Sequence, residues 1–163
     1  MKRAAPYGTL SVFTYKSRIV ARLVPRSELP AVAHAVLAGL FGPQRDSMFS
    51  LTIVDSGCFF LYDESLSVAF DGVLGSGLQR YCCLYIHEGS ESVRGSESAG
   101  TLAALSARLA REALPVLNIT TVERNFLLVH EHHADKALST LQRAIESGVV
   151  DDTADAGAWY VAL

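Results

Sequence analysis

The sequence predicts an α+β fold, with two ferredoxin-like (βαββαβ) domains in tandem. Three observations support this prediction. Short apolar runs typical of strands alternate with segments whose leucines recur every three or four residues, as on one face of a helix. Both halves of the chain share the order strand, helix, strand, strand. Residues 59–64 (FFLYDE) also align with residues 126–131 (FLLVHE), and each closes the second strand of an expected hairpin.

The first half begins with two apolar runs, 10–13 and 19–24, separated by a polar step at 16–18. This pattern predicts a hairpin or two short strands. Pro25 ends the second run, and a helix is expected over 28–41 because apolar residues there share one helical face. These apolar positions are Leu29, Val32, Val36 and Leu40.

A hairpin is expected next, with strands at 48–54 and 58–62 joined by the turn Asp55-Ser56-Gly57. The following stretch, 65–77, has mixed polarity and three glycines, which favours a domain boundary there. Domain 1 is therefore expected to span 1–77, and domain 2 is expected to span 78–163.

The second half repeats the element order of the first. The expected elements are a strand at 81–86, a helix through Leu102 to Ala113, strands at 116–121 and 126–130, a helix over 134–145 and a terminal edge strand at 158–163. The leucines of the two helices are expected to form the core. They are Leu102, Leu105, Leu109, Leu138 and Leu141.

The composition of the chain argues against nucleic-acid binding and membrane binding. The formal net charge is −3, so the chain lacks the basic excess that attracts nucleic acid or an anionic membrane surface. No apolar run approaches the roughly 20 residues that span a bilayer, and no signal-peptide core follows Met1-Lys2-Arg3. We therefore expect a soluble, cytoplasmic protein that binds neither nucleic acid nor membrane.

The side chains with reactive groups give no enzyme signature. The three cysteines cannot all pair within one chain, and we expect small core residues, with a reactive thiol as the alternative. Four adjacent residues at 130–133 do not have the spacing of the helical zinc motif. No nucleophile elbow or phosphate-binding glycine turn is present. We predict no catalytic residue, no metal and no cofactor. The residues considered are Cys58, Cys82, Cys83, His130, Glu131, His132 and His133.

Residues 98–103, 114–121 and 125–129 resemble the second ACT domain of the tandem ACT-domain proteins. This family includes bacterial stand-alone ACT pairs and the cytosolic arginine sensors called CASTOR. The resemblance extends over roughly residues 8–147 and implies a non-catalytic regulatory protein that binds an amino acid. Asn125 stands where the family usually has an aspartate, which disfavours a ligand with a cationic side chain.

The start of the second-half helix is the expected binding site. A helix N-terminus offers unpaired N–H groups and a positive partial charge to a carboxylate, although plain helix capping explains the same residues. The resemblance adds the strand end at 119–121, whose carbonyl groups would accept from an ammonium group. The expected ligand-binding residues are Ser98, Ala99, Gly100, Thr101, Ile119, Thr120, Thr121 and Asn125.

Two other functions stay open. The first is a protein-protein interaction module with the same fold and no small ligand. The second is an enzyme that uses one of the three cysteines as its nucleophile. The resemblance also implies a homodimer and a regulatory protein partner that reads the ligand-bound state.

Overall fold

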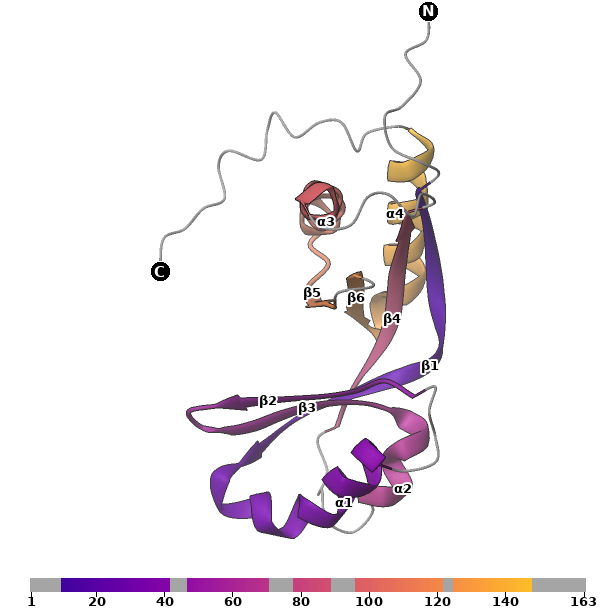
Figure 1. Cartoon of the computed structure of the whole chain (residues 1–163). Coiled ribbons are helices and arrows are strands. Elements are labelled where there is room, and N and C mark those ends of the chain that lie inside the picture. Colours follow the sequence, from indigo (N-terminus) through magenta and orange to yellow (C-terminus); the bar gives the residue numbers. More distant parts are fainter. Residues whose placement is uncertain (1–9, 42–46, 71–77, 89–95, 122–124, 148–163) are drawn as a thin grey trace, which may run out of the picture. The chain divides into compact units, whose positions relative to one another are not determined.

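The computed structural model describes residues 10–41, 47–70, 78–88, 96–121 and 125–147 (Figure 1). The predicted α+β class and the repeated order of strand, helix, strand and strand are confirmed. The elements are β1 (Leu10–Pro25), α1 (Leu29–Phe41), β2 (Phe49–Val54), β3 (Gly57–Asp63), α2 (Ser67–Phe70), β4 (Gln79–Glu88), α3 (Ser96–Arg111), β5 (Val116–Thr120), β6 (Asn125–His130) and α4 (Ala134–Glu146). Short 3-10 helices at Arg26–Glu28, Glu64–Leu66 and Glu131–His133 precede α1, α2 and α4.

The N-terminal strand corrects one prediction. A hairpin or two short strands were expected over residues 10–24, whereas β1 is one continuous strand of 16 residues. The polar step at 16–18 contains none of the strongest turn formers, Gly, Pro, Asn and Asp, and its one weaker turn former is Ser17. The Ser17 hydroxyl instead donates a hydrogen bond to the Asp63 carboxylate at 2.6 Å. This polar side chain therefore has a partner while the backbone stays extended.

The strands follow the order β2-β3-β1-β4-β6-β5, and β1/β3, β2/β3 and β5/β6 pair antiparallel. The chain divides into two compact units. The middle unit is 16–82, and the terminal unit combines 1–15 with 83–163. These limits differ from the expected consecutive domains, because β1 and β4 each run from one unit into the other. The terminal unit thus takes a strand from the start of the chain.

The middle unit is built from α1, α2 and one face of its strands. A buried cluster joins Val20 and Val24 of β1 to Phe60 and Tyr62 of β3. Phe70 of α2 stacks on Tyr62, with 4.4 Å between the ring centroids. Residues 65–77 were expected to form a boundary loop, so α2 was missed. A single helical turn leaves too short a periodic pattern to recognise in a sequence.

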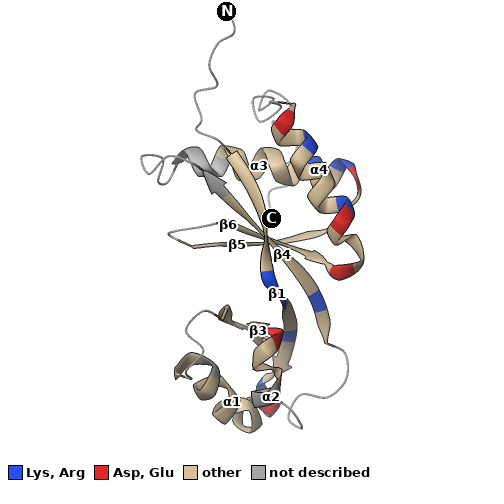
Figure 2. Cartoon of the chain, turned by 90° about the vertical axis from the view of Figure 1, so that its right-hand side faces the viewer, with Lys and Arg blue, Asp and Glu red and all other residues tan. Residues whose placement is uncertain are grey.

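The terminal unit packs α3 and α4 together over its core. Leu105, Leu109 and Leu141 are buried as predicted, whereas Leu102 and Leu138 are only half-buried. Charged residues cover the solvent side of α4, while α1 of the middle unit carries no charged side chain (Figure 2). The predicted terminal strand at 158–163 lies outside the described residues. No described helix is both long and apolar enough to span a membrane.

Thr140 of α4 is 7% exposed, and its hydroxyl has no hydrogen-bond partner. We expect the isosteric substitution Thr140→Val to raise the free energy of unfolding by about 1 kcal/mol, because it removes an unpaired buried polar group. Urea denaturation measures the change. The exposed Thr14→Val is the control and should stay within about 0.5 kcal/mol of wild type. A less stable Thr140→Val would mean that the hydroxyl is satisfied in solution.

Candidate functional site

The first turns of α3 carry half of the predicted site. α3 begins at Ser96, so the predicted residues 98–101 lie inside the helix rather than immediately before it. Gly100 is half-buried, and among the described residues no atom outside its own helical turn lies within 4 Å of the position that a Cβ would occupy. Its neighbour Thr101 is 6% exposed, a low value for a polar residue. The side chains of Ser98 and Ala99 lie outside the described part of the chain.

The other half of the predicted site lies where β5 ends and β6 begins. Thr120 and Asn125 are register partners across this hairpin, and Ile119 pairs with Phe126. Asn125 is 8% exposed, whereas Thr120 and Thr121 are exposed to solvent. The hairpin therefore brings a buried amide next to an open strand end.

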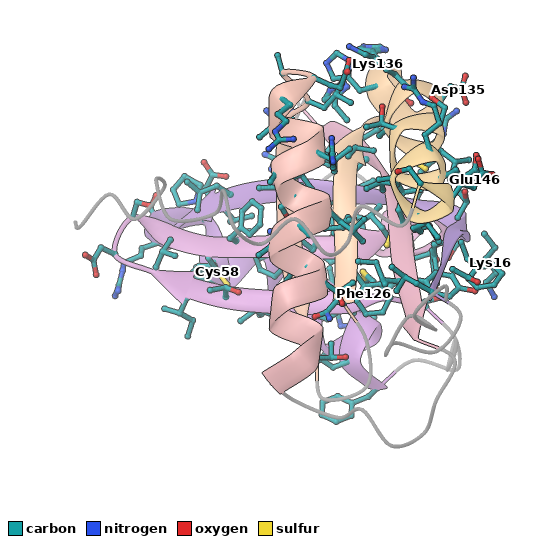
Figure 3. All side chains as sticks on the ribbon, turned by 90° about the horizontal axis from the view of Figure 1, so that it is seen from above. Lys16, Cys58, Phe126, Asp135, Lys136 and Glu146 are labelled. Carbon is teal, nitrogen blue, oxygen red and sulfur yellow. The ribbon has the colours of Figure 1, made fainter. Side chains whose placement is uncertain are left out.

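In a strand-helix-strand connection whose two strands are parallel, the helix begins and the second strand ends at the same edge of the sheet. The terminal unit has such a connection in β4-α3-β5, so we expect the two halves of the predicted site to share one edge. Figure 3 agrees with this placement. Lys136, which pairs with Glu112 just beyond the C-terminal end of α3, lies at one end of that helix, and Phe126 lies toward the other.

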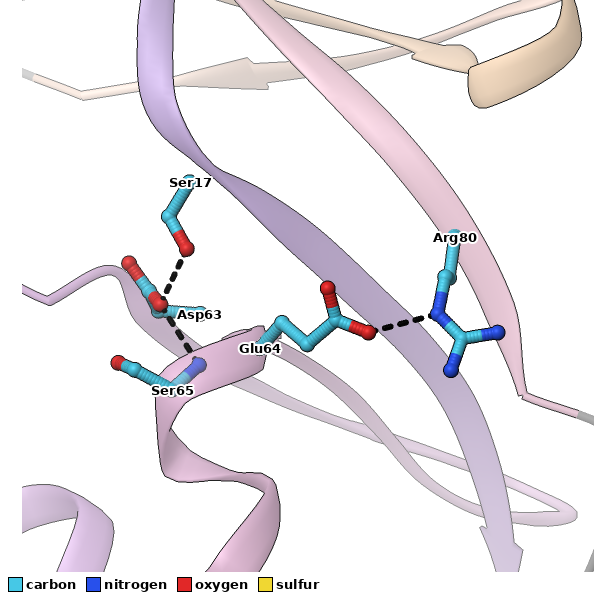
Figure 4. A network of polar contacts seen from close by, with 5 residues as sticks. All are labelled: Ser17, Asp63, Glu64, Ser65 and Arg80. Carbon is cyan, nitrogen blue, oxygen red and sulfur yellow. Dashed lines mark hydrogen bonds and ion pairs between the residues drawn. The ribbon is translucent and has the colours of Figure 1, made fainter.

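Sequence reasoning missed a polar cluster in the middle unit (Figure 4). Asp63 ends β3 and is 1% exposed. Its Oδ1 accepts a hydrogen bond from the Ser17 hydroxyl at 2.6 Å and another from the Ser65 backbone N–H at 2.9 Å. The Asp63 N–H donates to the Met48 carbonyl at 2.9 Å. The Asp-Glu-Ser sequence after a strand is a recognisable capping signal, but the contact with Ser17 is not readable from the sequence.

The internal repeat explains the position of Asp63. Asp63 and His130 are aligned in the sequence, and both lie between a strand and a 3-10 helix. Their backbone angles are nearly equal, with φ −59° and ψ 132° at Asp63 and φ −54° and ψ 139° at His130. Only Asp63 caps the following turn with its side chain. The polar cluster therefore stabilises the junction between β3 and the 3-10 helix that follows it.

Two ion pairs among the described residues are exposed. Arg80 Nε lies 2.7 Å from Glu64 Oε1, and Lys136 Nζ lies 3.0 Å from Glu112 Oε2. The hydrogen bond from Lys136, followed by its charge, lowers the pKa of Glu112. The stability from this pair is present above the unfolded-state pKa of the carboxyl and is lost as pH falls. Exposed pairs of this kind contribute little to stability.

The described residues give no sign of an activated thiol or of a metal site. Cys58 is 3% exposed, and burial raises the pKa of its thiol, which disfavours the nucleophilic thiolate. Cys83 is buried and Cys82 half-buried, and no disulfide joins any two of the three cysteines. Within the described ranges, no three His, Cys, Asp or Glu side chains are arranged to hold a metal ion.

No protein-family model and no curated protein matches the chain. Solved structures do match it in fold. A chain of the aspartokinase alpha and beta subunits is 15% identical, with a TM-score of 0.53 over 86% of this chain and 99% of that one. The ligand-free regulatory subunit of aspartate kinase from Thermus thermophilus is 15% identical, with a TM-score of 0.53 over 82% and 97%.

A Vibrio cholerae protein of unknown function, described as a possible transport protein, is also 15% identical, with a TM-score of 0.52 over 83% of this chain and 89% of that one. The aspartate kinase matches include regulatory subunits and a regulatory domain. The chain therefore shares the mixed helix and antiparallel sheet fold of the aspartate kinase regulatory subunit.

Proposed function

We propose that this chain is a non-catalytic regulatory protein that binds a free amino acid at the edge formed by the start of α3 and the β5–β6 hairpin. The observation that carries the proposal is Gly100. No described residue outside its own helical turn fills the space at its α-carbon beside the buried Thr101, which leaves room for a ligand to approach the helix backbone. The shared fold with aspartate kinase regulatory subunits supports a regulatory role.

The ligand is proposed to bind through its α-carboxylate and α-ammonium groups. The N–H groups and partial positive charge near the start of α3 suit the carboxylate. The carbonyl groups at the end of β5, from Ile119 to Thr121, suit the ammonium group. Asn125 is a neutral, nearly buried side chain at the same hairpin end. Asn125 itself offers no negative charge to a cationic ligand side chain, so we favour a neutral amino acid over arginine.

We also propose a cytoplasmic homodimer whose two ferredoxin-like, ACT-type units respond to the ligand. Each unit contributes four strands, in the orders β2-β3-β1-β4 and β1-β4-β6-β5. These orders are alike if β4 is taken as the first strand of the terminal unit and β1 as its last. A ligand that favours one arrangement of the protein would change the surface offered to a regulatory partner.

A thermal-shift screen with the twenty amino acids at millimolar concentration tests the site. A ligand at one hundred times its Kd should stabilise the wild type by about 2.7 kcal/mol. Gly100→Leu should abolish the shift, because the new side chain fills the space beside the helix backbone. It should leave the fold intact, since a Cβ at this position meets no atom within 4 Å.

The matched control is Leu117→Ala, an exposed position on β5 outside the proposed site, which should keep the wild-type shift. A Gly100→Leu protein that binds with unaltered affinity would show that the site is wrong. If no amino acid changes the Tm of the wild type, the alternative of an interaction module without a small ligand gains support.

A further inference from the structure

The two units of the chain correspond position by position. Helices α1 and α3 begin at Leu29 and Ser96, and strands β2 and β5 begin at Phe49 and Val116. Both pairs are 67 residues apart, which is also the spacing of the aligned segments that begin at 59 and 126. A constant spacing means that no insertion or deletion separates these parts of the repeat. Each residue of the proposed site therefore has one counterpart in the middle unit.

The counterpart of Gly100 carries a side chain. It is Ala33, which lies on α1 and is exposed. The Ala33 Cβ takes up part of the space that Gly100 leaves beside the backbone of α3. A ligand therefore has less room to approach the backbone of α1 at the same point of the helix.

The two nearly buried polar residues of the proposed site have no equivalent pair in the middle unit. Thr101 and Asn125 are 6% and 8% exposed. Their counterparts are His34, which is exposed to water, and Cys58, whose buried thiol is a weak hydrogen-bonding group. A polar ligand would thus gain little from these two positions of the middle unit.

The start of α1 has few N–H groups to offer to a carboxylate. The 3-10 helix Arg26–Glu28 runs directly into α1, and the Leu29 N–H donates to the Arg26 carbonyl. The next residue, Pro30, has no N–H. The corresponding residue of α3 is Glu97, which has one. The first two residues of α1 therefore supply no free donor to a ligand.

A cation of the chain itself lies at the end of the β2–β3 hairpin. Arg26 Nε donates to the Asp55 carbonyl at 3.1 Å. Asp55 directly follows Val54, which ends β2 and is the counterpart of Thr121. In the terminal unit, the carbonyl groups at this hairpin end are proposed to accept from the ammonium group of the ligand. The Arg26 guanidinium thus makes the kind of contact in the middle unit that the ligand is proposed to make in the terminal unit.

We infer that the chain binds one amino acid, in the terminal unit, and that groups of the chain itself close the corresponding position of the middle unit. The inference rests on the proposed function and adds its stoichiometry. A ligand in the middle unit would have to compete with Arg26 for the hairpin carbonyl. It would also lose water from its two charged groups without gaining buried polar partners. The two units therefore share a fold and differ in binding.

Isothermal titration counts the sites. The probe is the one of the twenty amino acids that gives the largest thermal shift, titrated into protein at a concentration above its Kd. The wild type should bind one molecule per chain, and Gly100→Leu should remove all of the binding heat rather than half of it. The matched control is Ala33→Leu, the same change at the counterpart position. Ala33 is exposed, so this variant should fold and should keep one site with an unchanged Kd.

Two molecules per wild-type chain would overturn the inference and leave the proposed function in place. A Gly100→Leu protein that keeps one of two sites would have the same meaning. Loss of binding in Ala33→Leu with retention in Gly100→Leu would move the ligand to the middle unit and overturn both proposals. If none of the twenty amino acids binds the wild type, the proposed function fails and the inference falls with it.

Discussion

Replacing Gly57 with alanine is expected to lower the free energy of unfolding by about 3 kcal/mol, the upper end of the usual range for overpacking. Gly57 begins β3 and pairs with Pro25 of β1. A Cβ at this position would lie 2.1 Å from the Val24 carbonyl oxygen and 3.0 Å from Pro25 Cα. Both are backbone atoms, so the clash cannot be relieved by a side-chain rotation. The strands themselves must move apart.

The matched control is the same substitution at Gly100, where we expect the free energy of unfolding to rise instead of fall. Gly100 is inside α3, and no atom of the described residues beyond its own helical turn lies within 4 Å of a Cβ there. Alanine is the better helix former, so Gly100→Ala should raise stability by roughly 0.5–1 kcal/mol. Urea denaturation of both variants measures the two changes. A Gly57→Ala protein as stable as the wild type would refute the close approach of β1 and β3 at this point.

Replacing Asp63 with alanine is expected to cost about 3 kcal/mol, because it removes a buried carboxylate that accepts two hydrogen bonds. Asp63 Oδ1 accepts from the Ser17 hydroxyl and from the Ser65 N–H, and both bonds are partly buried. A hydrogen bond to a charged group contributes about 1.5–3 kcal/mol, and the loss of the cap contributes to the same total. Chemical denaturation measures the effect.

Two variants separate the contributions at this junction. Asp63→Asn keeps an acceptor and should lose less stability than Asp63→Ala, so the difference reports the hydrogen bonds rather than the packing. Ser17→Ala removes one donor and should cost about 1 kcal/mol. In a double-mutant cycle the two alanine changes should couple by at least 0.5 kcal/mol. Additive effects would mean that Ser17 and Asp63 do not interact in solution.

The predicted binding site illustrates the limit of local patterns. The sequence alone placed Gly100 and Thr101 at a helix and Thr120 and Asn125 at a hairpin, because periodicity and turn residues are local signals. It did not reveal that Thr101 and Asn125 are nearly buried or that Gly100 borders open space. Exposure depends on which elements cover a residue, and that is a property of the packed unit.

The sequence by itself determined the α+β class, the repeated element order and three of the five leucines expected in the core. Leucines spaced for one helical face gave the buried side of α3 and α4, because helical geometry alone aligns such residues. Tertiary structure decided that β1 is a single strand, since Asp63, which is distant in the sequence, accepts a hydrogen bond from the Ser17 hydroxyl. It also decided the limits of the two units, because strand pairing joins residues 10–15 to the second half of the chain. Finally, tertiary packing left one apolar face of α1 exposed. The sequence could not predict which face this is, because nearly all residues of the helix are apolar.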